Sequence, residues 1–217
     1  MNQANRVAVF DLDHTLIDTD SANGFGLWAH RQGLWQVADL EGQLAHWHRL
    51  YVAGALPVAQ YLEFIISPLA GKSVAEVAAW VEAFAREEVL PKVRPQAMAA
   101  LEAHRAAGER VLVASATIAP IVAGICALLG VEELIATELA VMDGRYTGQG
   151  MGVPSIGPGK AWRLGQLLGG KPAFLTAYSD SINDLALLSL ADSPQVVTPD
   201  ARLAAVAEVN GWPVHHW

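Results

Sequence analysis

Short runs of apolar residues alternate along most of the chain with segments in which apolar residues recur every three or four positions. The runs predict buried β-strands, and the helical spacing predicts helices that bury one face. Strands that alternate with helices indicate a mostly parallel sheet covered on both faces. We therefore predict an α/β fold whose strands are residues 6–10, 110–114, 134–137, 173–178 and 195–197.

One long segment, residues 20–88, interrupts this alternation. No convincing strand occurs there, and apolar residues recur at helical spacing at Tyr61, Leu62, Ile65 and Ile66, then at Val74, Val77, Ala78, Val81 and Phe84. Pro91 and Pro95 mark the return of the chain to the alternating pattern of strands and helices. Residues 97–107 then predict a helix that Gly108 ends. We expect a small helical domain, residues 20–88, inserted into an α/β domain of residues 1–19 and 89–217.

Aromatic residues and a hairpin add detail. Trp28, Trp35 and Trp47 fall inside the insert, where we expect most of the aromatic side chains to pack in its interior.

Residues 140–147 contain Asp-Gly between apolar residues, which predicts a tight hairpin. The glycine-rich segment that follows fails the phosphate-binding P-loop pattern, because Pro154 and Ala161 occupy its glycine and hydroxyl positions.

Composition and charge restrict the class of protein. The chain is 53% hydrophobic, which excludes a disordered protein, and its net charge of −8 argues against nucleic acid as a partner. Cys126 is the one cysteine, and the apolar run at residues 7–10 is too short for a signal peptide, so we expect a cytoplasmic protein. Residues 111–131 carry no charge and could span a bilayer, but Ser115, Thr117 and Pro120 favour a buried strand followed by a helix. We expect no membrane association.

Carboxylates follow two of the predicted strands. Asp11 and Asp13 come directly after the first, where they could form a solvated turn, a metal-binding pair, or a nucleophile with its acid. Asp180 and Asp184 follow the strand at 173–178; Asp180 could ligate a hard cation and Asp184 could hold the metal's water, or both could simply favour a helix start.

Hydroxyls and a lysine complete the candidate chemistry. Ser115, Ala116 and Thr117 follow the strand at 110–114, where a helix N-terminus could bind phosphate or the hydroxyls could simply cap the helix. Lys160 lies at the opening of another predicted helix. Strand ends that carry such groups meet at one edge of a parallel sheet, so together they indicate a site rather than separate turns.

Asp11-x-Asp13-x-Thr15, Ser115, Lys160 and Asp180-x-x-x-Asp184 resemble, in order and strand context, the four motifs of the haloacid dehalogenase-like (HAD) superfamily. The helical insert after the first motif resembles the small cap of its phosphoserine phosphatase-like branch, subfamily IB. The resemblance implies a Rossmann-like core with this cap, and it extends over nearly the whole chain. An acid at Asp13 favours a phosphatase over a dehalogenase, because dehalogenation leaves no oxygen to protonate.

The resemblance also implies a role for each motif residue. Asp11 would be the nucleophile that forms an aspartyl-phosphate, and Asp13 the general acid and base. Mg²⁺ would be held by Asp11, the main-chain carbonyl of Asp13 and Asp180, with Asp184 holding its water. The phosphate would be contacted by Ser115, Ala116, Lys160 and Asn183.

The leaving group is less constrained by sequence. Asp20 aligns by spacing with an acidic residue that phosphoserine phosphatases place near the substrate's ammonium group, or it caps the first insert helix. Arg31 and Arg49 are candidates for binding a substrate carboxylate, and the Trp and His content of the insert suggests a ring-bearing leaving group. His14 departs from the small residue of many relatives; it could narrow the entrance, assist proton transfer or fill space, and we interpret it as filling space.

We therefore predict a Mg²⁺-dependent phosphatase of a small phosphorylated metabolite, resembling phosphoserine or histidinol phosphatases. The alternatives are a phosphotransferase that uses the same intermediate and a regulatory module that binds metal and phosphate without turnover. The apolar C-terminal residues 212–217 predict a tail that packs on the core or on a second subunit, and the oligomeric state stays open.

Overall fold

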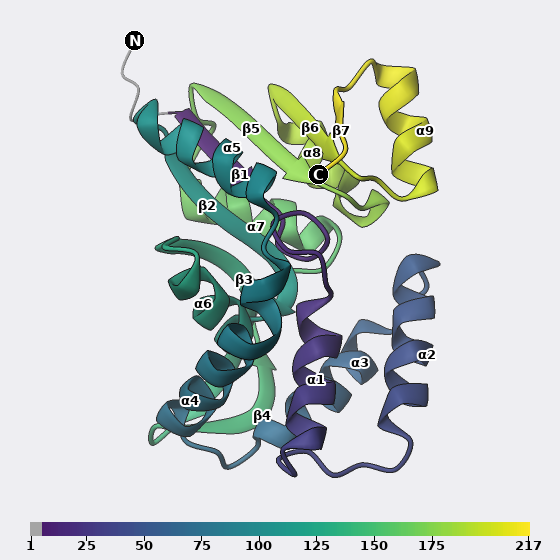
Figure 1. The fold of residues 1–217 in the computed structure, drawn as a ribbon, viewed down its shortest axis with the longest axis vertical. Helices are drawn as coiled ribbons and strands as arrows, with labels where there is room; N and C mark the ends of the chain where they lie inside the picture. The colour runs from purple at the N-terminus through teal and green to yellow at the C-terminus, as the bar shows by residue number, and fades with distance from the viewer. Residues whose placement is uncertain (1–5) are drawn as a thin grey trace.

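The computed structural model describes residues 6–217, so the first five residues of the predicted N-terminal segment lie outside the described residues. Seven strands in this range form one sheet in the order β4-β3-β2-β1-β5-β6-β7 (Figure 1), and every neighbouring pair is parallel except β3 and β4. The strands are β1 (Arg6–Phe10), β2 (Arg110–Ile118), β3 (Glu133–Met142), β4 (Arg145–Met151), β5 (Phe174–Ser179), β6 (Ser193–Val197) and β7 (Val214–His215). The predicted parallel α/β fold is confirmed.

Alternating residues of the central strand supply the two hydrophobic clusters on either side of the sheet. Ala8 and Phe10 pack on one face, and Val7 and Val9 pack on the other, so both sets are buried. The first face carries α5 (Pro95–Ala106) and α6 (Ala119–Leu128); the second carries α7 (Pro158–Leu168), α8 (Leu185–Leu190) and α9 (Ala201–Asn210). This two-sided burial explains why the strands are continuous apolar runs in the sequence.

The residues between β1 and β2 form helices, as predicted. They comprise α1 (Ser21–Arg31), α2 (Leu40–Val52), α3 (Val58–Ile66) and α4 (Val74–Phe84), followed by a π-helical turn (Ala85–Val89) and 3-10 turns at Ser67–Leu69 and Leu90–Lys92. The expected apolar positions fall on α3 and α4. We refer to residues 20–88 as the helical insert.

The helical insert packs against the sheet face that carries α5 and α6. Helix α4 lies on α6 and α3 lies beside β4, and Phe25, Trp28 and Phe84 belong to the same hydrophobic cluster as Phe10. In Figure 1, α1, α2 and α3 gather on one side of the molecule, with the end of α2 facing α9. Trp28 and Trp35 are buried as expected, whereas Trp47 is half-buried.

Strand β2 extends four residues beyond its predicted end. Ser115 and Thr117 belong to the strand rather than to a helix cap, and α6 begins only at Ala119, with Ile118 at its N-cap and Pro120 in its first turn. The interpretation of Ser115 and Thr117 as cap residues is therefore wrong. Thr117 and Ile118 are β-branched and continue the strand, while the pairing register with β3 shifts between Ala114 and Ile118.

Other expectations are confirmed. Met142 pairs with Arg145 across a two-residue turn, in which Asp143 and Gly144 have φ angles of 51° and 73°, as a primed hairpin turn requires. The glycine-rich segment after the turn is partly strand, because β4 continues to Met151. The C-terminal tail packs on the core: β7 pairs with β6, and the Trp217 ring stacks on Tyr178 with centroids 5.7 Å apart.

The uncharged segment 111–131 forms most of β2 and the whole of α6. None of the helices described between residues 6 and 217 combines the length and the apolar character needed to cross a membrane.

The contact between α4 and α6 depends on Gly124. A Cβ added at Gly124 would lie 2.4 Å from Val81 Cγ1, so Gly124→Ala should lower the free energy of unfolding by about 1–3 kcal/mol through overpacking. Gly165→Ala in α7 is the matched control, because no heavy atom lies within 4 Å of its added Cβ; it should raise stability by about 0.5–1 kcal/mol. Urea unfolding measures both, and equal stability of the two variants would contradict the close approach. Adding Val81→Ala to Gly124→Ala should recover part of the loss.

Candidate active site

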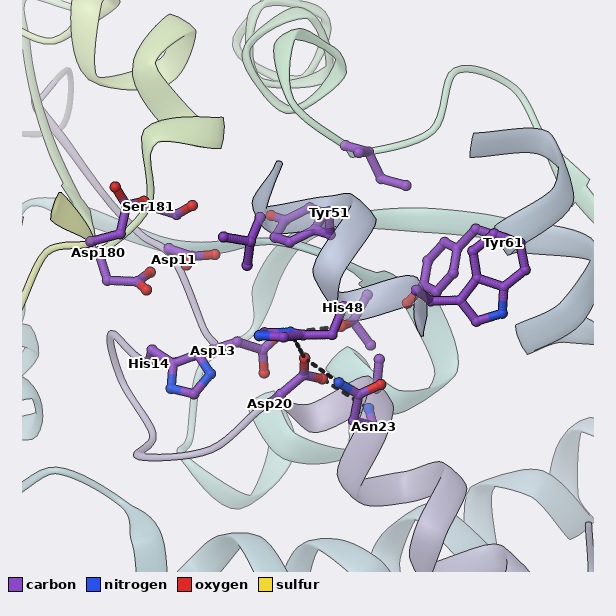
Figure 2. A pocket seen from close by; sticks show the side chains of 17 residues that line it. Asp11, Asp13, His14, Asp20, Asn23, His48, Tyr51, Tyr61, Asp180 and Ser181 are labelled. Carbon is purple, nitrogen blue, oxygen red and sulfur yellow. Dashed lines mark hydrogen bonds and ion pairs between the residues drawn. The ribbon is translucent and has the colours of Figure 1, made fainter. Parts of the chain in front are cut away.

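The carboxyl ends of β1, β2 and β5 meet at one edge of the sheet, beneath the helical insert. A cavity of about 140 Å³ lies there, between this edge and α1, α2 and α3 (Figure 2). It is lined by Asp11, Asp13, His14, Asp20, Ala22, Asn23, Trp47, His48, Tyr51, Val52, Tyr61, Ala116, Thr117, Ile156, Asp180, Ser181 and Asp200. Open parallel sheets place ligand sites at this position.

Behind the cavity, a buried lysine joins one carboxylate that follows β1 and another that lies at the start of α8. Lys160 Nζ donates to Asp11 Oδ1 at 2.8 Å and to Asp184 Oδ2 at 2.6 Å, and Ser179 Oγ donates to Asp184 Oδ2 at 2.8 Å. Lys160 is only 1% exposed. The sequence-predicted Asp11, Lys160 and Asp184 are thus brought into direct contact.

Burial alone would lower the pKa of Lys160, but the charges of Asp11 and Asp184 outweigh it and raise that pKa, so the ammonium is retained. Asp180 lies close to both carboxylates, with Thr15 Oγ1 donating to its Oδ1 at 3.3 Å. Burial and the charges of Asp11 and Asp184 raise the pKa of Asp180 to about 9. Three carboxyl groups therefore share one ammonium, and full ionisation of all three is disfavoured unless a further positive charge is supplied.

Asp13 is held differently from Asp11. Its Oδ1 accepts from the Ser21 main-chain N–H at 2.7 Å, and its Oδ2 accepts from Thr117 Oγ1 at 3.2 Å. Burial, with smaller contributions from the charges of Asp20 and Asp11, raises the pKa of Asp13 to about 7. A carboxyl group of that pKa can donate or accept a proton near neutral pH.

Of the predicted phosphate-contacting residues, only Ala116 is among those that line the cavity. Ala116 lines the cavity, and its main-chain carbonyl accepts from Thr137 Oγ1 at 3.1 Å. Ser115 is buried behind it, with its hydroxyl accepting from the Thr117 main-chain N–H at 3.1 Å. Asn183 is turned toward the helical insert, and its Nδ2 donates to the Tyr51 main-chain carbonyl at 3.1 Å.

The insert side of the cavity combines one carboxylate with several rings. Asp20 caps α1 by accepting from the Asn23 main-chain N–H and from Asn23 Nδ2, each at 2.8 Å, and it also lines the cavity. His48 Nδ1 lies 3.8 Å from Asp20 Oδ2, and this carboxylate raises the pKa of His48. Figure 2 shows Asp20 and His48 facing each other, with Tyr61 farther along the insert. Both sequence interpretations of Asp20, as a cap and as a cavity residue, fit its position.

Neither of the two candidate arginines is among the residues that line the cavity. Arg31 instead pairs with Glu88 at 2.8 Å, and Arg49 is exposed. His14 is exposed at the rim with a φ angle of 56°, so the interpretation that it fills space is wrong.

Several cavity residues carry no signal that sequence reasoning could use. Tyr51 and Tyr61 lie on helices and Asp200 lies at a helix start, and only the tertiary fold places them at the site. The Trp and His content of the insert predicts a ring-bearing leaving group, but it does not single out Trp47 or His48 as cavity residues. The sequence indicates Thr117 as a phosphate-binding or cap residue, and it carries no sign that the Thr117 hydroxyl contacts Asp13.

Comparison with known proteins identifies one family and relatives that are named as phosphatases. The family profile of the haloacid dehalogenase-like hydrolases matches residues 8–189. A histidinol-phosphatase of Neisseria meningitidis is 39% identical over 96% of this chain and 97% of its own. A phosphoserine phosphatase of Mycobacterium tuberculosis is 32% identical over 95% of this chain and 69% of its own. A solved Bordetella pertussis protein of unknown function superposes with a TM-score of 0.89 at 36% identity, with 98% of each chain covered.

Lys160 is expected to be essential to the stability of the site. Lys160→Met removes the ammonium between Asp11 and Asp184, so it should lower the free energy of unfolding by about 3–5 kcal/mol. Lys171→Met is the matched control, because Lys171 is 74% exposed and its pair with Asp192 is a surface contact; it should change stability by less than about 1 kcal/mol. Urea unfolding in the presence of EDTA measures both, and similar stabilities would show that the buried ion pairs matter little.

Proposed function

The chain belongs to the haloacid dehalogenase-like hydrolases, and we propose that it is a Mg²⁺-dependent phosphatase that hydrolyses a small phosphomonoester through an aspartyl-phosphate on Asp11. One observation carries the proposal: Asp11 lies against Lys160 at the cavity, while Asp13, two residues on, faces the same cavity with its pKa raised to about 7. Binding alone requires neither a nucleophile nor an acid beside it.

In the first half-reaction, a carboxylate oxygen of Asp11 attacks phosphorus. The new Asp11–phosphorus bond forms as the ester P–O bond breaks, and the proton of Asp13 passes to the departing oxygen. Asp11 needs no activating base, because a carboxylate attacks through an oxygen that already carries negative charge. The alcohol then leaves toward the insert side of the cavity.

In the second half-reaction, water attacks the same phosphorus. Asp13, now ionised, takes a proton from that water, the Asp11–phosphorus bond breaks, and inorganic phosphate is released. Both residues return to their starting states. Transfer to another alcohol would use the same steps with the alcohol in place of water.

The phosphoryl oxygens require positive charge and hydrogen-bond donors. We assign these roles to Lys160, Ser115, the backbone at Ala116 and Asn183, as the family resemblance implies. Lys160 is already charged and fixed by Asp11 and Asp184, so it requires little reorganisation during the reaction.

The carboxylates also fit a divalent cation. Asp184 Oδ1 is buried and has no hydrogen-bond partner among the residues described, and Asp11, Asp180 and Asp184 together exceed Lys160 by two negative charges when ionised. No three His, Cys, Asp or Glu side chains in residues 6–217 form a ready-made site, but the proposed set needs only Asp11, Asp180 and the main-chain carbonyl of Asp13. Such oxygen ligands suit Mg²⁺, which would neutralise phosphate charge, with Asp184 holding one of its waters.

We propose a leaving group that carries an amine and a ring but no carboxylate. Asp20 offers a carboxylate to a cation, Trp47, His48 and Tyr61 offer ring surfaces, and the described lining contains neither Arg nor Lys. The relative named histidinol-phosphatase supports this class, and histidinol phosphate is our leading substrate over phosphoserine.

The remaining features fit a small metabolite as partner. We propose that residues 20–88 act as a cap over a core formed by residues 1–19 and 89–217, so that water is excluded during the reaction. The net charge of −8 disfavours nucleic acid, and the buried free thiol of Cys126 is compatible with the cytoplasm as the compartment we propose.

The nucleophile and the metal can be tested together. Asp11→Asn should lower Mg²⁺-dependent hydrolysis of p-nitrophenyl phosphate by about a thousandfold or more, because it removes the attacking charge at nearly constant volume. EDTA should abolish wild-type turnover and added Mg²⁺ should restore it. Asp143→Asn, in the exposed turn between β3 and β4, is the matched control and should keep wild-type activity.

Substantial turnover by Asp11→Asn, or by the wild type in EDTA, would refute this mechanism. Phosphorylated product that accumulates with added alcohols in place of inorganic phosphate would instead identify a phosphotransferase.

Asp20→Asn tests the leaving-group assignment. The variant should raise KM for histidinol phosphate about tenfold, which corresponds to about 1.4 kcal/mol, and leave KM for p-nitrophenyl phosphate unchanged. Asparagine caps a helix as well as aspartate does, so α1 should stay intact. Asp39→Asn, at the N-cap of α2 and outside the cavity lining, is the matched control. Higher kcat/KM for phosphoserine than for histidinol phosphate would overturn the assignment.

A further inference from the structure

Two hydrogen bonds from separate parts of the chain fix the carboxyl group of Asp13. The Ser21 main-chain N–H, in the first turn of α1, donates to Oδ1, and the Thr117 hydroxyl, on β2, donates to Oδ2. One oxygen is thus held from the helical insert and the other from the sheet. Because each carboxyl oxygen has a further lone pair, both can accept these bonds while Asp13 still faces the cavity.

The Thr117 hydroxyl is itself oriented by a buried partner. Ser21 Oγ donates to Thr117 Oγ1 at 3.2 Å, and Ser21 and Thr117 are 0% and 5% exposed. A hydroxyl has a single proton to donate. With Ser21 donating to Thr117, the Thr117 proton is directed to Asp13.

We infer that Thr117 is a positioning residue for leaving-group protonation, which it promotes by fixing the Asp13 carboxyl group; this inference rests on the proposed function. Proton transfer from a side chain requires the acid within hydrogen-bond reach of the departing oxygen, at about 2.6–3.2 Å. A carboxyl group free to rotate would spend part of its time outside that geometry. The Ser21–Thr117–Asp13 chain removes this rotation before substrate binds.

The inference predicts an effect that depends on the leaving group. p-Nitrophenolate is a stable anion and needs little protonation, whereas the more basic phenolate depends on the acid. A residue that acts through Asp13 therefore matters more for phenyl phosphate than for p-nitrophenyl phosphate. A threonine that bound phosphate, or that only supported the fold, would affect both esters equally.

The experiment compares kcat/KM for the two esters in a set of variants. Thr117→Val keeps the shape of the side chain and removes the hydroxyl. It should lower kcat/KM for phenyl phosphate at least about tenfold more than kcat/KM for p-nitrophenyl phosphate. Thr117→Ser restores the hydroxyl and should recover most of the loss in kcat/KM. Asp13→Asn is the reference for complete loss of the acid and should show the same selectivity with a larger magnitude. Thr176→Val, at another buried threonine of the sheet, is the matched control and should change neither ester.

Equal losses on the two esters in Thr117→Val, or no recovery in Thr117→Ser, would overturn the inference. If Asp13→Asn is selective and Thr117→Val is not, only the role of Thr117 fails. If Asp13→Asn also lowers kcat/KM equally for both esters, the proposed acid is wrong and the inference falls with it. Should Thr117→Val fail to fold, Ser21→Ala provides the test, because it removes the hydroxyl that orients Thr117 while keeping the main-chain N–H to Asp13; it should show a smaller selective loss.

Discussion

Electrostatic repulsion among carboxylates at one sheet edge is the constraint around which this structure is arranged. Parallel strands deliver Asp11 and Asp180 to the same place, and Asp184 follows within one turn. Lys160 compensates part of this charge from within the protein, because it enters from α7 and contacts two of the carboxylates. A buried ammonium is costly unless it is paired, so the charges on both sides depend on each other. The carboxyl groups left uncompensated suit the edge to a cation, and a bound cation would in turn attract a phosphate ester.

The helical insert completes the site in a way that the sheet alone could not. It brings Asp20 and several aromatic rings over the cavity, and its first helix supplies a main-chain donor to Asp13. Asp13, the acid that we propose, follows β1 and is held by donors from β2 and α1 together. Asp20, which lines the cavity, and Ser21, which donates to Asp13, are neighbours at the start of α1, so the proposed leaving-group contact and the proposed acid depend on the same helix end.

The sequence predicted the fold and the strand-end carboxylates because both depend on local pattern. Apolar runs identify strands, and their carboxyl ends must coincide in a parallel sheet, so Asp11, Asp13 and Asp180 could be grouped without a structure. Lys160 lies far from them in sequence and was grouped with them by its motif. Thr117 was misassigned because a hydroxyl near a helix is an ordinary cap, and only the extension of β2 turns it toward Asp13. Tyr51 and Tyr61 belong to the cavity through helix packing, which no short motif encodes.

The attachment of the helical insert is uneven along its length. Helix α4 is packed on α6 within the main hydrophobic cluster, whereas the C-terminal end of α2 is tied to the core by Asn183 Nδ2 on the Tyr51 carbonyl and by Arg202 Nη1 on the Val52 carbonyl at 3.3 Å. Two such hydrogen bonds contribute only about 1 kcal/mol each. These two contacts cost far less to break than the packing of α4 on α6, so we expect any opening of the helical insert above the cavity to begin at the C-terminal end of α2. The rate of product release would then respond to a few polar contacts near α9, at a distance from the atoms that react.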